Sequence, residues 1–379
     1  MKVVEGGVTA PLGFKANGMY CGIKRSGKAD LGLIYCDKPA ATVGVFTKNS
    51  IKAAPLVVTM RKIKKGMAQA IIVNSGNANC YTGPIGLKYA EQSTEVVAKI
   101  LDLNPDHVLV SSTGIIGKQL PFTKIKEGAP ALVKGLTEKG GTKFARAIMT
   151  TDLKLKEIAV VVTIGGKKVT IGACGKGSGM IEPNMATMLG FVTTDAAISL
   201  KMLKLALSRA TAKSFNAITV DGCMSTNDMV TLTANGLAGN TVITTAGQDF
   251  ETFYRALEHV CIDLAKKIVL DGEGATKFIE ITVNGAKDFN QAKMIAMKVA
   301  NSNLVKTAAF GSNPNWGRVA AAVGALGLKI AEDDLKINFS SFKEKNISIK
   351  VGLSLGRGEA TVWTSDLSCD YVKINAEYN

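Results

Sequence analysis

The stretch AQAIIVNSGNANCYTGPIGLKYAEQSTEVVAKILDLNPDHVLVSS (68–112) contains the alternation that decides the fold class. It opens with a short apolar run at 68–74 and closes with another at 107–112, and both have the composition of buried strands. Between them, 86–101 has the pattern of an amphipathic helix. This alternation of strands and helices indicates an α/β (α+β) protein with sizeable buried sheets.

The same alternation continues on both sides of this stretch. Further strands are expected at 56–60 and 157–164, and further helices at 199–215 and 247–270. After about residue 276 the pattern changes, because 347–353 and 370–378 alternate with the period of two that is typical of half-buried strands. We therefore expect a larger α/β core over 1–275 and a smaller, strand-rich α/β domain over 276–379.

Composition limits the class of protein. The chain has 379 residues, of which 46% are hydrophobic, enough for a sizeable core. It has neither a signal-peptide pattern nor an uncharged apolar run near 20 residues, so we expect a cytoplasmic protein with no membrane partner. Its seven cysteines are scattered and never form a CxxC pair, which favours reduced thiols over a disulfide framework or a zinc site.

The formal net charge of +15 raises the question of nucleic-acid binding. The lysines are dispersed, however, and aromatic residues make up only 6% of the chain. No basic cluster is interleaved with rings on which bases could stack. We therefore expect no nucleic-acid partner, and a solvated basic surface that attracts anionic substrates.

The chain has only two histidines, His107 and His259, which limits the chemistry. His259 falls off the apolar stripe of the helix expected at 247–270, so we expect it to face water. His107 follows the turn-forming cluster 104–106. Neither histidine has a nucleophile beside it in sequence. Two histidines do not exclude a Ser-His-Asp triad or a multi-histidine metal site, but they supply few of the residues that either needs, and we expect no metal.

Three glycine-bearing loops leave alternatives open. GKGSG (175–179) and DGEGATK (271–277) could cradle phosphate or let two backbones approach closely, and the full P-loop spacing occurs nowhere. SSTGIIG (111–117) follows an apolar strand. It offers the Thr113 hydroxyl beside the Gly114 amide, a pair that can stabilise a developing oxyanion or form a plain turn after a strand.

Taken together, the motifs give the chain a family resemblance that spans nearly its whole length. The chain resembles the glutamate N-acetyltransferase family, also called the ornithine acetyltransferase family, of arginine biosynthesis. The stretches that carry the resemblance follow in order: FTKNSIKAAP (46–55), NSGNANCYTG (74–83), SSTGIIG (111–117), MTTD (149–152), KGSGMIEPNMATML (176–189), DGEGATK (271–277), VANSNLVKTA (299–308), PNWGR (314–318) and INAEY (374–378).

The resemblance implies that the chain cuts itself between Ala186 and Thr187. It would then consist of the segments 1–186 and 187–379, with Thr187 as the catalytic nucleophile. The chemistry needs no histidine, because an N-terminal threonine carries its own base, an α-amine with an ordinary pKa of roughly 7.7–8.0. Without the family, Thr187 would be read as a buried residue of a Met-rich core.

The resemblance also implies roles for further residues. Thr113 and Gly114 match the oxyanion-hole pair, and four positions match substrate contacts together with Thr187: Thr150, Lys176, Glu273 and Asn375. Lys176 suits a carboxylate and Glu273 suits the ammonium of an ornithine side chain, while the other two can hydrogen-bond amide or carboxylate groups. The plain alternatives are a solvated Lys176 and a helix-terminal Glu273.

The chain departs from the family pattern at several places. DGCMSTND (221–228) carries Cys223 and Met224 where the family has Asp and Thr, and Asn313 stands where it has Asp. The chain ends at Asn379, where the family has a further threonine that contacts substrate. We expect the last change to weaken carboxylate binding and the Cys223 change to alter local hydrogen bonds only.

The resemblance further implies a layered α/β sandwich core and an α2β2 assembly of the two segments. The activity it implies is transfer of acetyl from N2-acetyl-L-ornithine to L-glutamate through an acetyl-threonine, with no cofactor. Whether acetyl-CoA also donates acetyl is left open by the sequence. The alternative enzyme class is an N-terminal-nucleophile aminopeptidase or amidase, in which water is the acceptor.

Overall fold

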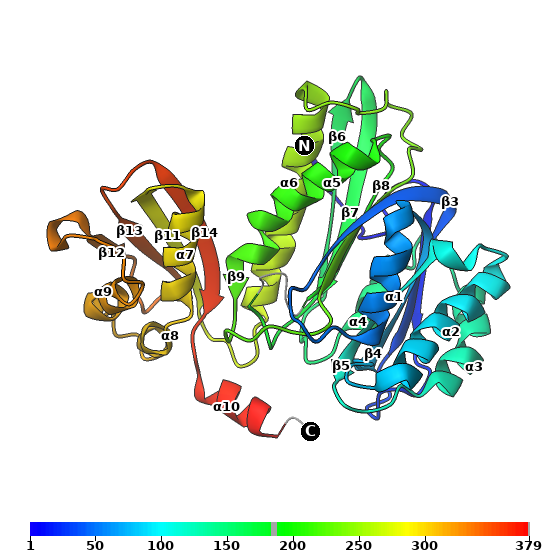
Figure 1. Ribbon diagram of the computed structural model, residues 1–379, viewed down its shortest axis with the longest axis horizontal. Coiled ribbons are helices and arrows are strands. Elements are labelled where there is room, and N and C mark those ends of the chain that lie inside the picture. Colours follow the sequence, from blue (N-terminus) through cyan, green and yellow to red (C-terminus); the bar gives the residue numbers. More distant parts are fainter. Residues whose placement is uncertain (183–187, 378–379) are drawn as a thin grey trace. The chain divides into compact units, whose positions relative to one another are not determined.

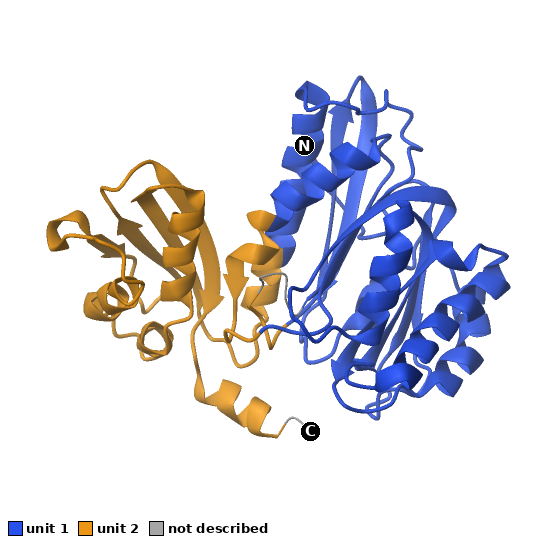
Figure 2. Ribbon diagram, viewed as in Figure 1, with its two compact units in different colours: residues 1–177, 184–211, 224–264 blue, residues 178–183, 212–223, 265–379 orange. Residues whose placement is uncertain are grey.

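The computed structural model describes residues 1–182 and 188–377 (Figure 1). The chain forms two compact units, shown in different colours in Figure 2. The first consists of Met1–Gly177, Asn184–Thr211 and Met224–Leu264, and the second of Ser178–Pro183, Ala212–Cys223 and Ala265–Asn379. The domain boundary expected near residue 275 stays a prediction.

The first unit is built on one large mixed sheet. Its strands follow the order β1-β6-β7-β8-β10-β3-β4-β5, and β2 pairs with β3 beside this path. The β4·β5 and β8·β10 pairs are parallel and the others antiparallel. The strands are β1 (Lys2–Val4), β2 (Phe14–Met19), β3 (Leu31–Phe46), β4 (Met67–Asn77), β5 (Val108–Ile115), β6 (Lys156–Ile164), β7 (Lys167–Lys176), β8 (Leu189–Thr194) and β10 (Met229–Ala234).

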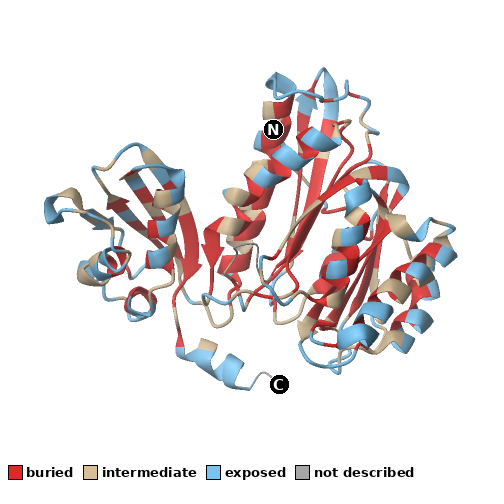
Figure 3. Cartoon of the chain, viewed as in Figure 1, coloured by how far each residue is buried: buried red, intermediate tan, exposed pale blue. Residues whose placement is uncertain are grey.

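Helices cover both faces of this sheet because successive side chains of a strand point to opposite faces. Leu31 and Leu33 of β3 pack with α1 (Ala54–Lys62), α2 (Gly83–Leu101) and α3 (Phe122–Lys134). Ile34 and Cys36, at the even-numbered positions of the same strand, pack with α4 (Gly141–Ile148) in a second apolar cluster. Buried residues accordingly concentrate on the strands and on the helix faces turned toward them (Figure 3). The expected layered α/β class is confirmed.

Two long helices of the sequence prediction are also present. They are α5 (Leu200–Ala212) and α6 (Gln248–Leu270). The α6 stripe that begins with Phe253 and Leu257 is fully buried, and His259 is exposed, as expected. His107 closes the 3-10 turn Pro105–His107, in which the Asn104 side chain accepts from the Asp106 amide at 2.9 Å.

The second unit contains a smaller sheet in the order β12-β13-β11-β14-β9. One face of β11 is fully buried through Ile279, Ile281 and Val283. The strands are β9 (Ile218–Thr219), β11 (Phe278–Ala286), β12 (Lys336–Phe339), β13 (Asn346–Gly352) and β14 (Gly358–Ser365), and the helices are α7 (Phe289–Ala300), α8 (Asn303–Phe310), α9 (Trp316–Gly324) and α10 (Cys369–Ala376).

Two strand predictions are wrong. Residues 56–60 lie in α1, where Pro55 occupies the first turn and Leu56 and Val58 are buried. Five apolar residues fit a buried helix as well as a strand, so periodicity alone could not decide between them. Residues 370–378 begin in α10 instead of a strand, because Ser368 caps that helix by accepting from the Tyr371 amide at 3.1 Å.

Two further findings concern the described residues. None of their helices combines the length and the apolar character needed to cross a membrane. All seven cysteines are free thiols.

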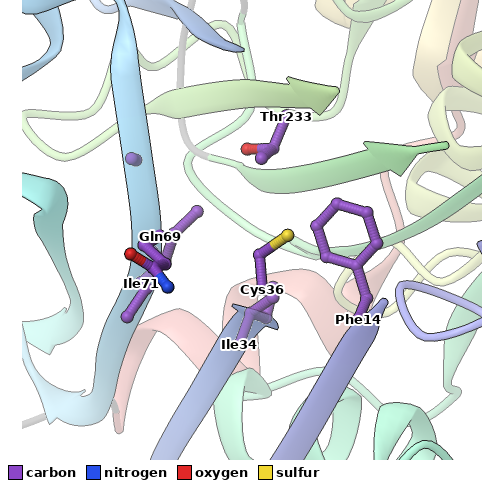
Figure 4. A pocket seen from close by; sticks show the side chains of 8 residues that line it. Phe14, Ile34, Cys36, Gln69, Ile71 and Thr233 are labelled. Atoms are coloured by element: carbon purple, nitrogen blue, oxygen red, sulfur yellow. The ribbon is translucent and has the colours of Figure 1, made fainter. Parts of the chain in front are cut away.

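A pocket lies inside the first unit, between strands of the large sheet (Figure 4). Phe14, Ile34, Cys36 and Thr233 are among its lining residues, and Asn235 donates to the Cys36 sulfur at 3.5 Å. None of the expected active-site residues that the structure describes lines this pocket. It is therefore a feature of core packing.

Candidate active site

The turn that carries Thr113 and Gly114 forms where β5 ends against β4. Gly114 has φ +131°, and a Cβ atom there would lie 2.6 Å from the amide nitrogen of Asn77. The β4·β5 ladder shifts register at this point, so that Asn77 pairs with both Thr113 and Ile115. Glycine is therefore required at 114 by conformation and by space. Thr113 is buried beside it, with 8% of its surface exposed.

Asn227 supports this turn from the segment that precedes β10. Its side-chain amide donates to the carbonyl of Ser112 at 2.8 Å and to that of Ala78 at 2.7 Å. The Ala78 amide in turn donates to the Ile115 carbonyl at 3.0 Å. One buried amide thus fixes the strand end immediately before Thr113.

Lys176, the last residue of β7, reaches the same turn. Its side chain is buried, and its Nζ donates to the Thr113 hydroxyl at 3.3 Å. The same ammonium lies 3.9 Å from a carboxylate oxygen of Asp152. The structure therefore brings together two of the expected site residues that are 63 positions apart in sequence.

Thr150 follows α4 and is half-buried. Its amide donates to Asp152 Oδ2 at 2.9 Å. Asp152 also accepts from Lys156 Nζ at 2.7 Å, and both of these side chains are almost fully buried. Burial alone would raise the pKa of Asp152, but the ammonium groups of Lys176 and Lys156 hold it well below its ordinary value, so this carboxylate is charged.

A third lysine, Lys24, lies close to this group. Its Nζ donates to the carbonyls of Met149 at 2.6 Å and Ala29 at 2.7 Å. Burial lowers the pKa of Lys24 to about 8; nearby Lys176 adds to the shift and Asp30 and Asp152 oppose it. The first unit thus gathers several ammonium groups around one buried carboxylate, an arrangement that suits an anionic ligand.

Glu273 and Asn375 lie together in the second unit. The Asn375 side-chain amide donates to Glu273 Oε2 and to the Tyr371 carbonyl, each at 3.0 Å. The Glu273 amide donates to the Ser178 carbonyl at 3.0 Å. Gly179 leaves room for the carboxylate, because a Cβ atom at 179 would lie 2.2 Å from Glu273 Oε2.

The chain ahead of the proposed cut is held to residues 219–223 within the second unit. The amides of Met180 and Ile181 donate to the Asp221 carboxylate at 2.6 and 2.8 Å. The Glu182 amide donates to the carbonyl of Cys223 at 3.0 Å. Because position 223 contributes its backbone to this contact, a cysteine in place of the family's aspartate leaves it intact. Ala186 and Thr187 lie outside the described residues.

Asp228 is a buried carboxyl at the start of β10. The hydroxyls of Thr47 and Ser225 and the amide of Met188 lie near it, but neither carboxyl oxygen accepts a hydrogen bond from the described part of the chain. Burial raises the pKa of Asp228 well above its ordinary value, and these neighbours offset the shift only in part.

Sequence reasoning missed four residues of this region: Asp152, Lys156, Asn227 and Asp228. Asp152 closes the quoted MTTD stretch, and Asn227 and Asp228 close DGCMSTND, so position within a motif was the available signal. Among the described residues, no group of three or more His, Cys, Asp or Glu side chains could hold a metal ion.

Comparison with known proteins shows which family the chain matches. The model of the ArgJ family matches residues 15–344 and 338–379. An arginine biosynthesis bifunctional protein ArgJ from Caldanaerobacter subterraneus subsp. tengcongensis is 45% identical over 402 residues, covering 100% of both chains. The ArgJ protein of Geobacter sulfurreducens is 46% identical and covers 97% of this chain and 98% of its own.

Solved structures are also similar. A crystal structure of an arginine biosynthesis bifunctional protein ArgJ from Bacillus halodurans is 41% identical, with a TM-score of 0.46, and covers 49% of this chain and 98% of its own. An ornithine acetyltransferase from Mycobacterium tuberculosis, complexed with ornithine, is 36% identical, with a TM-score of 0.45 and the same coverages.

Proposed function

Because the chain belongs to the ArgJ family, it is an acetyltransferase of arginine biosynthesis, and we propose that it moves acetyl from N2-acetyl-L-ornithine to L-glutamate. The observation that carries this proposal is the match over the whole length of the chain. The site geometry supports it, since Lys176 and the Thr113–Gly114 turn lie together on one sheet.

The proposed reaction has two halves that share Thr187. In the first half the Thr187 hydroxyl attacks the acetyl carbonyl, and its own α-amine takes the hydroxyl proton. The C–N bond then breaks, ornithine leaves with that proton, and acetyl-threonine remains. In the second half the glutamate amine attacks the ester carbonyl and the ester C–O bond breaks, so that N-acetyl-L-glutamate leaves and a proton from the amine returns to the Thr187 oxygen. The Thr113 hydroxyl and the Gly114 amide would stabilise the oxyanion of both halves.

Substrate recognition would use charges of both signs. In the first unit, Lys176 is proposed to pair with a substrate carboxylate, with Thr150 as a hydrogen-bonding neighbour. In the second unit, Glu273 is proposed to receive the ornithine ammonium, with Asn375 beside it. This assignment is supported by the contact that Lys176 makes with Thr113 and by the hydrogen bond that fixes Glu273.

We further propose that the chain is cut between Ala186 and Thr187 in the cytoplasm, and that the segments 1–186 and 187–379 assemble as α2β2. Acetyl-CoA is proposed as a second acetyl donor. The support for that second donor is the word bifunctional in the names of the full-length relatives.

One experiment tests the cut and the transfer together. Purified wild-type protein should run as two pieces on a denaturing gel, with Thr187 at the start of the second piece. It should pass acetyl from acetyl-ornithine to glutamate faster than to water, which separates it from an amidase. Thr187→Ala should stay whole and inactive. A cut elsewhere, or an active uncut Thr187→Ala protein, would refute the proposal.

A further inference from the structure

Asp152 connects the two chain segments that carry Thr150 and Lys176. Its Oδ2 accepts from the Thr150 amide at 2.9 Å, and its Oδ1 accepts from the Gly177 amide at 2.7 Å. Gly177 directly follows Lys176, whose ammonium lies 3.9 Å from the same carboxylate. One buried side chain therefore sets where residues 150 and 176 stand relative to each other.

The peptide group between Met149 and Thr150 is held at both of its ends. Its carbonyl oxygen accepts from Lys24 Nζ at 2.6 Å, and its N–H donates to Asp152 at 2.9 Å. In a trans peptide these two groups point in opposite directions, so the two contacts fix the orientation of the peptide plane. The position of the Thr150 side chain follows from that orientation.

The contacts continue as far as the oxyanion turn. Lys176, placed by Asp152, donates to the Thr113 hydroxyl at 3.3 Å. Lys24, Asp152 and Lys176 thus form an unbroken series of contacts from the Met149–Thr150 peptide to Thr113. Each link is a charge-assisted hydrogen bond or a close ion pair inside the first unit, where such interactions are strong.

We propose that Asp152 is a positioning residue for the acetyl transfer, which holds Thr150, Lys176 and Thr113 in one relative geometry. This role rests on the proposed function. Asp152 does not itself touch the reacting atoms in this scheme. A simpler role would be to neutralise the buried Lys156, whose Nζ lies 2.7 Å from Asp152 Oδ1, and the test must separate the two.

A double variant separates them. In Asp152→Asn the buried Lys156 charge loses the carboxylate that neutralises it, so the melting temperature falls whichever role is correct. In Asp152→Asn/Lys156→Met the Lys156 charge is gone and only the more distant Lys176, 3.9 Å away, still faces an amide in place of the carboxylate, so the melting temperature should return part of the way to that of wild type. If Asp152 only neutralises Lys156, activity returns as well. If Asp152 positions the site, kcat/KM stays reduced on the order of 10²-fold, the scale of a misplaced catalytic group.

The distribution of the loss between kcat and KM supplies a second readout. A defect of folding removes active molecules, so it lowers the apparent kcat and leaves KM for acetyl-ornithine unchanged. Misplacing Thr150 and Lys176 weakens substrate binding, so KM rises as well. Lys156→Met alone keeps both backbone contacts of Asp152 and should retain most of the activity. Asp37→Asn, which breaks an ion pair with Lys15 at the surface, is the control for removing a carboxylate.

Lys24→Met is a further test variant, and it leaves the buried ion pair between Asp152 and Lys156 intact. The variant removes the hydrogen bond to the Met149 carbonyl, so KM for acetyl-ornithine should rise while the protein stays folded. Unchanged kinetics in folded Lys24→Met protein would show that Lys24 does not help to orient the Met149–Thr150 peptide. Full activity in the double variant, beside an active wild type, would overturn the positioning role and leave the proposed function standing. A wild type without transfer would overturn both.

Discussion

Gly114 lies so close to the backbone of Gly76 that a Cβ atom on Gly114 would stand 2.4 Å from the Gly76 carbonyl carbon. Both residues have positive φ, +131° at Gly114 and +95° at Gly76. At the proposed oxyanion turn the two strands can therefore come together only because Gly114 carries no side chain, whereas a Cβ atom on Gly76 would meet Lys24, 2.9 Å from its Cγ.

Gly114→Ala should accordingly disable the enzyme. The added methyl group pushes the turn away from β4, and the Gly114 amide leaves the position from which it would bind an oxyanion. We expect acetyl transfer to fall on the order of 10²–10³-fold, as when one oxyanion donor is lost. Steady-state kinetics with acetyl-ornithine and glutamate measure this.

Gly117→Ala is the matched control, because Gly117 also has positive φ, but a methyl group added there would meet no atom within 4 Å. Gly117→Ala therefore has the backbone strain of a positive φ but no steric clash. A loss of transfer as large as that of Gly114→Ala would contradict the interpretation.

The hydroxyl of Thr113 should be tested separately from the turn. Thr113→Ala removes the proposed donor and the acceptor of the Lys176 hydrogen bond, so the acetylation rate should fall on the order of 10²–10³-fold. Thr113→Ser keeps a hydroxyl and should recover most of that loss. The measurement is single-turnover acetylation of Thr187. Normal rates in Thr113→Ala would mean that the residue only forms the turn.

The pocket for the substrate side chain can be tested at Glu273. Glu273→Gln removes an attractive charge from the ornithine half of the reaction only. It should weaken use of acetyl-ornithine roughly tenfold to a hundredfold, and use of glutamate less. Kinetics of the two half-reactions give the two values. Equal losses in both halves would assign Glu273 to the fold or to the end of the site that both substrates share.

Gly179→Ala should reproduce this effect without changing the charge. A methyl group at 179 would meet the end of the Glu273 side chain, which can turn away without disturbing the fold. The protein should therefore fold normally and lose mainly the ornithine half-reaction. Gly247→Ala, where no atom lies within 4 Å, serves as the control. Unaltered use of acetyl-ornithine by Gly179→Ala would count against a role for Glu273.

Asp228 should make stability depend on pH. Its pKa in the folded protein is raised by burial, so the folded state binds the proton more tightly than the unfolded state, whose pKa is about 3.9. The contribution of this carboxyl to the free energy of unfolding is therefore fully present below about pH 3.9. It is lost as the pH rises toward the pKa of the folded protein, at about 1.4 kcal/mol per pH unit.

The asparagine side chain of Asp228→Asn does not ionise, so this variant should not lose stability as the pH rises. Its melting temperature relative to wild type should therefore increase from pH 4.5 to pH 7. Thermal melts at several pH values measure the difference. A constant difference across this range would show that Asp228 is not protonated in the folded protein.

The fold could be predicted where the periodicity was long. The α6 stripe and the runs at β4, β5 and β6 each extend far enough for one period to dominate. The segment 56–60 is too short for one period to dominate, and in 370–378 a longer alternation was overridden; in both a local signal outweighed the pattern, Pro55 in the first turn of α1 and the Ser368 cap of α10. The order of strands in the large sheet depends on contacts between distant segments, which no local pattern contains.

The site could be predicted only as a set of residue types in motifs. The resemblance named Thr113 and Lys176, but their 3.3 Å contact depends on how β5 and β7 are placed in the sheet. Asn227 escaped prediction because it acts on backbone carbonyls, and a backbone partner leaves no mark on the sequence. Asp152 has a backbone partner too, the Gly177 amide, and its ion pair with Lys176 depends on tertiary structure. Glu273 and Asn375 are 102 positions apart, and their pairing likewise comes from tertiary structure.

The place of β8 in the large sheet has a consequence for a chain cut before residue 187. Strands β8 and β10, which follow the cut, lie between β7 and β3, which precede it. Cleavage would break one covalent bond and leave every rung of these ladders in place, so the products would be interlocked halves of one sheet. Two separate genes, one for each half, should then be able to complement each other when expressed together, and neither half alone would have a complete sheet on which to fold.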